Sequence, residues 1–236
     1  MRRIFFNLKH IFDFLRGRPV FELPYYREAE LSRLMNLFAH VDLDAWRGMR
    51  ILEVGAGLGH LGDVFAQLGF DVTSSDGRPE HVERMKARGR DAIVLDLDEQ
   101  GVEGLEGYDV ILAFGVLYHL GNPERFLESC GQHAKVLLLE SAVSDAAEPK
   151  LDMVKEIAAG WRGQDQALNE IGCRPSVSWV EATCRRAGFD RIRDISNPIA
   201  DWEIGTFDWS PTGHGETRSG AKNYRRMWVM ERTTPE

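Results

Sequence analysis

The sequence predicts an α/β fold in which helices cover both faces of a parallel sheet. Five short apolar runs lie at 50–54, 71–75, 92–95, 109–114 and 135–140. Helical stretches separate them at 59–68, 79–88 and 123–131. Near-continuous apolar strands that alternate with helices are typical of a parallel sheet buried on both sides. Ligands bind beyond the carboxyl ends of the strands in such sheets, so we expect the functional site at that edge.

Two helical patterns precede the first strand. Residues 3–16 place apolar side chains on one helical face, with basic side chains beside them. Residues 27–40 predict a second helix, whose inward face is expected to carry Leu31, Leu34, Leu37 and Phe38. We therefore expect a helical extension over 1–47, followed by the α/β domain over 48–236.

The chain after the fifth strand has a different composition. Residues 141–176 contain few strand signals, and 198–221 are rich in Gly, Trp, Ser, Thr and Pro. Long loops in a compact domain often carry function, so both are candidate substrate loops. Ser176 is placed to cap a helix over 177–187, with Gly188 just past its end. Strands are expected at 189–195 and 226–230.

Composition restricts the class of protein. The 236 residues include 29 Lys and Arg against 37 Asp and Glu, a net charge of −8 that disfavours a general nucleic-acid binder. The three cysteines have no short pairing interval, which argues against a disulfide framework and favours a reducing cytoplasm. No apolar run approaches the ~20 residues of a membrane span. The first residues do not form a convincing signal peptide.

Four motifs follow the first four strands. A glycine-rich turn ends the first, in the run Ile51-Leu52-Glu53-Val54-Gly55-Ala56-Gly57-Leu58-Gly59, and glycine lets a backbone turn sharply against a ligand. Asp76 follows the second strand, where an acidic group can accept both hydroxyls of a ribose. Asp96 follows the third, where a carboxylate can accept from an adenine amino group. Phe114 ends the fourth and leads into residues 115–120.

These motifs, in this order and spacing, resemble those of class I S-adenosylmethionine-dependent methyltransferases. The resemblance covers residues 48–140 clearly and the remainder loosely. It implies a Rossmann-like sheet of seven strands with the last one antiparallel, and S-adenosyl-L-methionine as cofactor. The cofactor-binding residues that it implies are Glu53, Gly55, Gly57, Gly59, Asp76, Asp96, Leu97 and Phe114.

A nicotinamide-dependent dehydrogenase is the main alternative. The run Gly57-Leu58-Gly59-His60-Leu61-Gly62 satisfies the pattern G-x-G-x-x-G. That match begins two residues after Gly55 has ended the strand. Counted from Gly55, the third glycine position is His60, and the fingerprint fails. The spacing therefore favours a methyltransferase.

His119 is the candidate catalytic base, because it lies just beyond the carboxyl end of the fourth strand. Methyl transfer to a hydroxyl requires removal of its proton, and an imidazole suits that role. The alternative is that His119 caps the next helix or packs beneath the pocket. Glu140, at the end of the fifth strand, is the second catalytic candidate. It could bind the acceptor hydroxyl, act as a base or contribute to a metal site that Asp165 could join. No compact cluster has metal-ligand spacing, so no metal is assigned.

The candidate substrate residues are Tyr118, Asp165, Arg174 and Arg226. Residues 161–176 mix aromatic and planar hydrogen-bonding groups, which suit a polyhydroxylated acceptor. The run Gly172-x-Arg174-Pro175-Ser176 loosely resembles sugar-directed O-methyltransferases. Arg174 could instead bridge loops, and Arg226 could pair with the acidic surface rather than with an anionic substrate.

The sequence therefore predicts methylation of a small or carbohydrate-like acceptor at an oxygen atom. A methyltransferase acting on tRNA or another nucleic acid is the alternative, and a cofactor-binding protein without catalysis is a third class. A cytoplasmic location is expected. Residues 1–18 would lie peripherally on the inner membrane face, or pack on the domain as a lid or a dimer contact. The oligomeric state stays open.

Overall fold

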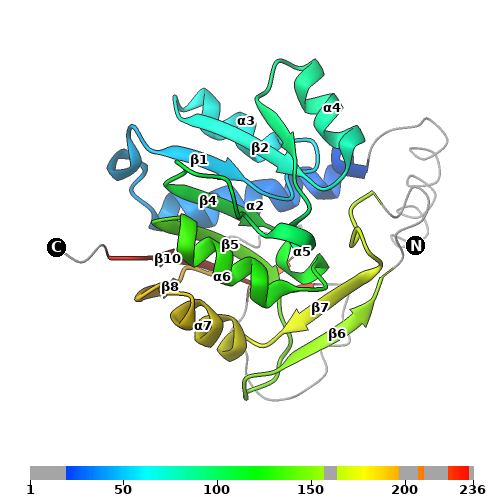
Figure 1. Cartoon of the computed structure of the whole chain (residues 1–236), viewed down its shortest axis with the longest axis vertical. Coiled ribbons are helices and arrows are strands. Elements are labelled where there is room, and N and C mark those ends of the chain that lie inside the picture. Colours follow the sequence, from blue (N-terminus) through cyan, green and yellow to red (C-terminus); the bar gives the residue numbers. More distant parts are fainter. Residues whose placement is uncertain (1–19, 157–163, 197–206, 210–222, 234–236) are drawn as a thin grey trace.

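The computed structural model describes residues 20–156, 164–196, 207–209 and 223–233. Seven strands form its main sheet, in the order β3-β2-β1-β4-β5-β10-β8 (Figure 1). They are β1 Arg50–Glu53, β2 Asp71–Asp76, β3 Ala92–Val94, β4 Val110–Phe114, β5 Val136–Ala142, β8 Arg191–Asp194 and β10 Asn223–Glu231. Strands β1 to β5 are parallel, whereas β10 is antiparallel to β5 and β8. This confirms the predicted seven-strand sheet with its last strand antiparallel. A short strand, β9 Phe207–Asp208, pairs with β10.

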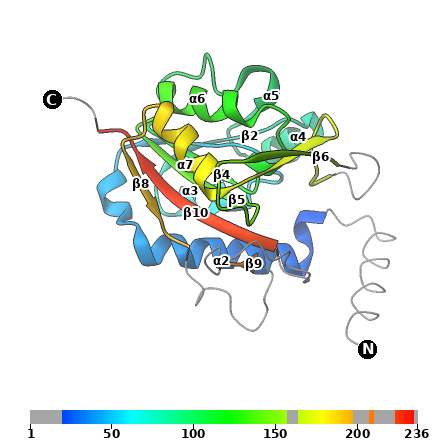
Figure 2. The same cartoon turned by 90° about the horizontal axis from the view of Figure 1, so that it is seen from below.

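Helices cover both faces of this sheet, as Figure 2 shows for α2 on one side and α6 on the other. The helices are α2 Pro24–His40, α3 His60–Gln67, α4 Pro79–Ala87, α5 Leu97–Gln100, α6 Pro123–His133 and α7 Val177–Arg186. Three short 3-10 turns accompany them: η1 Val20–Glu22, η2 Leu43–Trp46 and η3 Leu117–His119. None of the helices in the described ranges is long and apolar enough to cross a bilayer.

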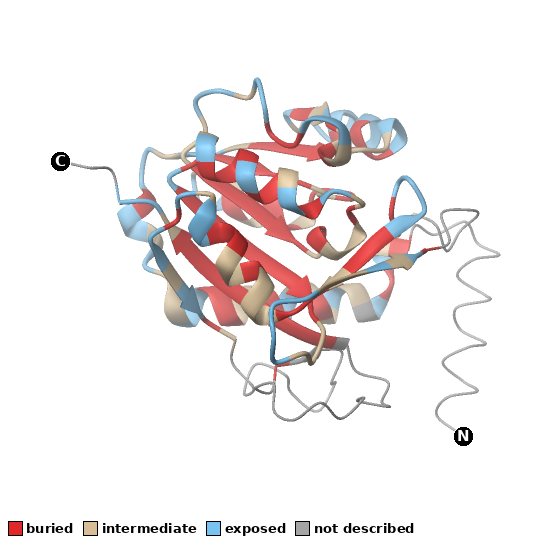
Figure 3. Cartoon of the chain, turned by 60° about the horizontal axis from the view of Figure 1, so that its bottom comes forward, coloured by how far each residue is buried: buried red, intermediate tan, exposed pale blue. Residues whose placement is uncertain are grey.

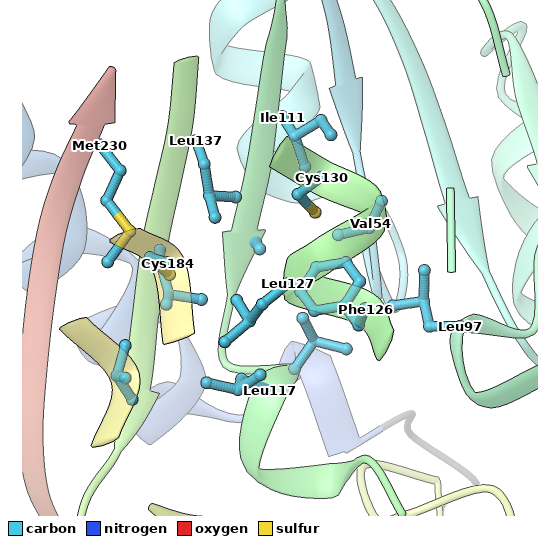
Figure 4. Close-up of a cluster of buried hydrophobic side chains, with 14 of the residues drawn as sticks. Val54, Leu97, Ile111, Leu117, Phe126, Leu127, Cys130, Leu137, Cys184 and Met230 are labelled. Carbon is cyan, nitrogen blue, oxygen red and sulfur yellow. The ribbon is translucent and has the colours of Figure 1, made fainter. Parts of the chain in front are cut away.

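Two hydrophobic clusters separate the sheet from its helices. Leu127 of α6 and Cys184 of α7 pack with Leu137 of β5 on one face (Figure 4). Leu37 of α2 packs with Leu138 of the same strand on the other face. Consecutive strand residues point to opposite faces, so β5 serves both clusters. Figure 3 shows the buried strands in the centre and the exposed outer faces of the helices.

Helix α2 begins three residues earlier than expected and turns a different face to the sheet. Leu34 and Leu37 pack inward, as predicted. Leu31 and Phe38 are 54% and 47% exposed, so the prediction that they face inward is wrong. The helix instead turns Arg33, which is buried, toward the sheet. A pattern of apolar residues alone cannot show that an arginine takes an inward position.

Residues 141–176 contain a hairpin that the sequence did not predict. Strand β6 Leu151–Lys155 pairs antiparallel with β7 Ile171–Pro175, and Figure 1 shows the hairpin beyond α5. Glycine and proline lower the β propensity of β7, which explains why the local sequence pattern did not predict this strand. The expected cap is confirmed: Ser176 accepts a hydrogen bond from the Trp179 backbone N at 3.2 Å. Gly188 follows the helix with φ +104°, also as expected.

Two predictions cannot be compared with the structure. The helix expected over 3–16, with its membrane, lid and dimer alternatives, lies outside the described residues. Most of the loop 198–221 does too. The three cysteines lie within the described ranges and are buried free thiols.

Candidate active site

A cleft opens beyond the carboxyl ends of β1 to β4, at the edge of the sheet where the site is expected. Its space is about 1070 Å³, including the part that is open to solvent. The strand ends form one wall, and the η1–α2 segment and residues 164–168 form the others. Residues from each wall include Phe21, Tyr26, Glu53, Gly55, Asp76, Asp96, Leu97, Phe114, Tyr118, His119 and Asp165. Segments that are far apart in the sequence therefore meet here.

The glycine-rich turn shapes the floor of this cleft. Gly55 has φ +61°, and a Cβ there would clash with the side chain of Val116. Gly57 has φ +57°, and a Cβ there would lie 2.6 Å from Cε1 of Phe21. These left-handed conformations favour glycine. Glycine is therefore required at both positions. Val116, which follows β4, leaves no room for a Cβ at Gly55, and Phe21 of the N-terminal segment leaves none at Gly57.

Glu53 lies buried at the end of β1, facing the cleft. Its carboxyl group accepts hydrogen bonds from Ser74 Oγ at 2.7 Å and from the Gly62 backbone N at 3.1 Å. Burial raises the pKa of Glu53 to about 7, although these hydrogen bonds act in the opposite direction. The group therefore titrates near neutral pH, so its charge depends on the solution and on what binds beside it.

Asp76 collects three donors at the end of β2. Its Oδ2 accepts from the Gly57 backbone N at 2.8 Å. Its Oδ1 accepts from the Arg78 backbone N at 2.9 Å and lies 3.0 Å from His81 Nδ1. The carboxylate thus joins the glycine-rich turn to the start of α4 and presents a fixed acceptor to the cleft.

Asp96 has a local role as well as a place in the cleft. It caps α5 by accepting a hydrogen bond from the Asp98 backbone N at 3.0 Å. Leu97 is buried beside it, and both residues line the cleft. The capping bond explains how a short helix begins directly after β3.

His119 is paired with a glutamate that the sequence did not single out. Its Nδ1 lies 2.6 Å from Oε2 of Glu156, which follows β6. The His119 side chain is 15% exposed and that of Glu156 is 4% exposed. Burial raises the pKa of Glu156, but the hydrogen bond and the charge of His119 outweigh it and hold that pKa below its ordinary value. The pair is therefore a carboxylate and an imidazole at the edge of the cleft.

Glu140 lies fully buried beneath the cleft and does not line it. Its two oxygens accept from Arg33 Nε at 2.8 Å and Arg225 Nη1 at 3.0 Å. Arg225 also donates to the Tyr118 hydroxyl at 3.0 Å and lies over its ring, 4.4 Å from the centroid. The network joins α2, β5, β10 and η3, so Glu140 is part of an ionic core under Tyr118.

Residues 164–168 connect several walls of the cleft. Gln164 Oε1 accepts from the Val20 backbone N at 3.2 Å, and Asp165 accepts from the Tyr26 hydroxyl. The carbonyl of Gln166 accepts from Arg78 Nη2 at 3.0 Å. This segment thus reaches both the N-terminal wall and the end of β2.

Most of the predicted site residues meet in this cleft. Gly57 and Gly59 do not line it, since they face Phe21 and Met85. Arg174 does not line it either. Its guanidinium lies 5.4 Å from the centroid of the Tyr118 ring and donates to the Tyr118 carbonyl at 3.3 Å, so it contacts a residue that does line the cleft.

Arg226 is directed elsewhere. It donates to the Trp209 carbonyl at 2.8 Å and approaches Asp194. Arg225 takes the position near the cleft because neighbouring residues of a strand point in opposite directions.

Several residues of the site were not identified from the sequence. Phe21, Arg33 and Glu156 carried no local signal and reach the site through tertiary contacts. In the ranges that the structure describes, no group of three or more His, Cys, Asp or Glu side chains is placed to hold a metal ion.

Comparison with known proteins identifies the fold and the family. A family model described as a methyltransferase domain matches residues 24–193. A ubiquinone biosynthesis O-methyltransferase of Cereibacter sphaeroides is 29% identical over 177 residues, which is 70% of this chain and 71% of that protein. The same enzyme of Roseobacter denitrificans is 29% identical over 178 residues, covering 71% of this chain and 72% of that protein.

Solved structures share the architecture at low identity. The N-terminal domain of EvdMO1 with SAH bound has a TM-score of 0.60 and 19% identity, covering 88% of this chain and 81% of that one. An S-adenosylmethionine-dependent methyltransferase from Mesorhizobium loti has a TM-score of 0.58 and 13% identity, covering 85% and 98%.

Sheet order and family match together define a class I S-adenosylmethionine-dependent methyltransferase. The chain belongs to the methyltransferase domain family. It is a methyl-transferring enzyme with S-adenosylmethionine as its cofactor.

Proposed function

We propose that this enzyme methylates a hydroxyl oxygen of a small acceptor. The proposal rests on the position of His119, which lines the cleft while its Nδ1 atom is paired with a carboxylate. The curated relatives support oxygen as the target, since they are named O-methyltransferases. Nothing among these relatives favours a nucleic-acid substrate.

The cofactor occupies the part of the cleft over β1 to β4 in this proposal. Glu53 and Gly55 would face its methionine part, Asp76 its ribose, and Asp96 with Leu97 its adenine ring. Phe114 would line the same space. The residues fit such a group: Asp76 is a fixed acceptor, and Gly55 lines the cleft without a side chain. Gly57 and Gly59 would shape the turn without lining the cleft.

The proton chemistry belongs to His119. When bound, the cofactor supplies a methyl group on a positively charged sulfur, which keeps the electron pair of the broken bond. The acceptor oxygen bonds to that methyl group as its proton moves to Nε2 of His119. Glu140 is already paired with Arg33 and Arg225, so its contribution is to hold Tyr118 rather than to accept the proton.

A carbohydrate-like acceptor is the finer part of the proposal. Tyr118 and Asp165 line the cleft and offer an aromatic face and a carboxylate, and the guanidinium of Arg174 lies against the Tyr118 ring. Asp165 and Arg174 belong to the predicted substrate loop 141–176. EvdMO1, which shares the fold, has been crystallised in the presence of SAH and D-fucose. A phenolic acceptor would use the same base and fewer of the polar contacts.

A labelled methyl-transfer screen tests both the oxygen assignment and the carbohydrate assignment. Candidate acceptors are sugars, nucleotide sugars, glycolipids, phenols and tRNA, with labelled S-adenosylmethionine and the full chain. We expect label on an oxygen atom of a hydroxylated small molecule. Methylation only at nitrogen or carbon would overturn the oxygen assignment. Turnover of phenols without any sugar would overturn the carbohydrate assignment alone.

A further inference from the structure

One carboxylate holds both His119 and the 164–168 segment. Oε2 of Glu156 lies 2.6 Å from His119 Nδ1 and accepts from the Ala167 backbone N at 2.9 Å. Oε1 of Glu156 lies 3.4 Å from Arg174 Nη1. Because Glu156 is almost fully buried, these donors replace the water that a charged group would otherwise bind. The orientation of Glu156 is therefore defined from three separate segments.

Gly172 provides the space in which Glu156 lies. A Cβ at Gly172 would be 2.5 Å from the carbonyl oxygen of Tyr118 and 2.6 Å from Oε1 of Glu156, so it would crowd both η3 and the carboxylate. Gly172 is on β7 and pairs with Val154 of β6, so the hairpin itself creates this space. The hairpin thus delivers the carboxylate to η3, on which His119 lies.

An ionised carboxylate only accepts hydrogen bonds, so the Nδ1 atom of His119 carries a proton in this pair. In the neutral ring, Nε2 then bears the lone pair that can receive a proton. We propose that Glu156 is a positioning residue, which fixes His119 in this tautomer and orientation and ties it to the 164–168 segment. The proposal rests on the proposed function, in which Nε2 of His119 receives the hydroxyl proton.

Glu156 also matches the charge that the reaction creates. As the acceptor oxygen gains the methyl group, the positive charge leaves the sulfur and the proton makes His119 an imidazolium. A carboxylate 2.6 Å from Nδ1 stabilises that cation. The link to Ala167 makes this support depend on the segment that also contacts Val20 and Tyr26. The base is therefore best oriented when the cleft wall is in place.

The pH response of His119 depends on more than Glu156. Tyr118 lies beside it, with ring centroids 4.0 Å apart. In the part of the chain that the structure describes, further charged or titratable groups near this pair include Cys173, Arg174, Asp98 and Arg225, from β7, α5 and β10. Glu156 is the carboxylate in direct contact with the ring.

Glu156→Gln is the sharpest variant. The amide oxygen can still accept from His119 and Ala167, but the negative charge is removed. We expect kcat to fall by roughly 10–100-fold with little change in KM. The acid limb of the pH–rate profile should move to lower pH, because an anion no longer stabilises the protonated ring. A purely structural role would not move that limb.

Two comparisons complete the kinetic test. Asp152→Asn is the matched control on the same hairpin, since its side chain pairs with Lys150 and is 45% exposed; it should keep the wild-type rate and profile. In a His119→Ala background, Glu156→Gln should add little further loss, because both residues act through one step. Wild-type kcat and an unmoved acid limb in folded Glu156→Gln would overturn the proposal. Full additivity with His119→Ala would overturn it too.

Nuclear magnetic resonance gives a readout that needs no acceptor. Long-range 1H–15N spectra of the full chain should show His119 protonated at Nδ1 in the wild type. Glu156→Ala, which removes the acceptor, should shift it toward the Nε2-protonated form, and Gly172→Ala, which displaces the carboxylate, is the second variant with the same expected shift. Glu156→Gln, whose amide oxygen can still accept from Nδ1, should keep the wild-type tautomer. An unchanged tautomer in folded Glu156→Ala or Gly172→Ala would sink the positioning role. If the tautomer shifts but no hydroxyl compound is methylated, the proposed function fails while the His119–Glu156 link stands.

Discussion

Glu53 has a buried carboxyl group that makes the stability of the fold depend on pH near neutrality. Its pKa is about 7 in the folded chain, against an ordinary value of 4.5. The folded state therefore binds more protons than the unfolded state between these values. Its contribution to stability must fall as pH rises through that window.

Glu53→Gln should remove this penalty. The amide oxygen can accept from Gly62 and the amide nitrogen can donate to Ser74, so the contacts survive. We expect the variant to be more stable than the wild type at pH 8, by up to roughly 3 kcal/mol, and nearly equal at pH 4. Urea denaturation at both pH values measures this. A variant that is less stable at pH 8 would contradict the assignment of burial as the cause.

His119→Ala separates chemistry from binding. A general base typically contributes about 10²–10⁴ in rate, and we expect kcat to fall within that range. Cofactor affinity should stay unchanged, as measured by calorimetry, because His119 acts on the acceptor proton. His133→Ala, in the last turn of α6, is the control and should keep its activity. Near-normal turnover in His119→Ala would make this histidine structural.

Elements were predicted best where the signal is local. The strands and helices from 50 to 140 follow their apolar spacing, and the Gly55 and Asp76 motifs lie at strand ends as expected. The β6–β7 hairpin depends on pairing between distant segments and gave no such signal. Glu156 directly follows β6 and is brought to the site by that hairpin. It could not be recognised as a partner of His119 before the hairpin was placed.

The contact between η1 and the glycine-rich turn makes a testable link between elements. Gly57→Ala would force Phe21 from its place against the turn, whereas Gly89→Ala has a similar φ of +77° and open space around it. Both should lose about 1 kcal/mol of stability from the left-handed backbone. Only Gly57→Ala should also weaken cofactor binding, by about tenfold, or ~1.4 kcal/mol. Equal affinities in the two variants, measured by calorimetry, would remove Phe21 from the cofactor site.

At the scale of the whole molecule, the sequence did not predict how the buried charges are arranged. Arg33 and Arg225 are nearly two hundred positions apart, yet both reach Glu140 under the cleft. The sequence suggested Arg226, but the direction of each side chain depends on the register of β10 against β5. Register is a property of the assembled sheet. Sequence spacing predicted the strand without predicting which arginine faces the site.

Cofactor binding should stabilise the entire domain. A ligand that binds only the folded state at 100 times its Kd adds about 2.7 kcal/mol. For a chain of this size that corresponds to a rise in Tm of about 5–11 °C. Thermal unfolding with and without S-adenosylmethionine measures it, and Asp76→Ala should reduce the rise at the same concentration. An equal rise in Asp76→Ala would exclude that carboxylate from cofactor binding.

Strand β10 lies between β5 and β8 and is the only strand that pairs with β8 within the described residues. During translation, β1 to β5 leave the ribosome long before β10 does. Until it emerges, β5 is an open edge and β8 has no neighbour in the main sheet. Glu140 also lacks its ion-pair partner Arg225 until β10 has emerged. A nascent chain therefore cannot complete its ionic core before β10 has emerged, and an exposed apolar edge of this kind is where a chaperone would bind.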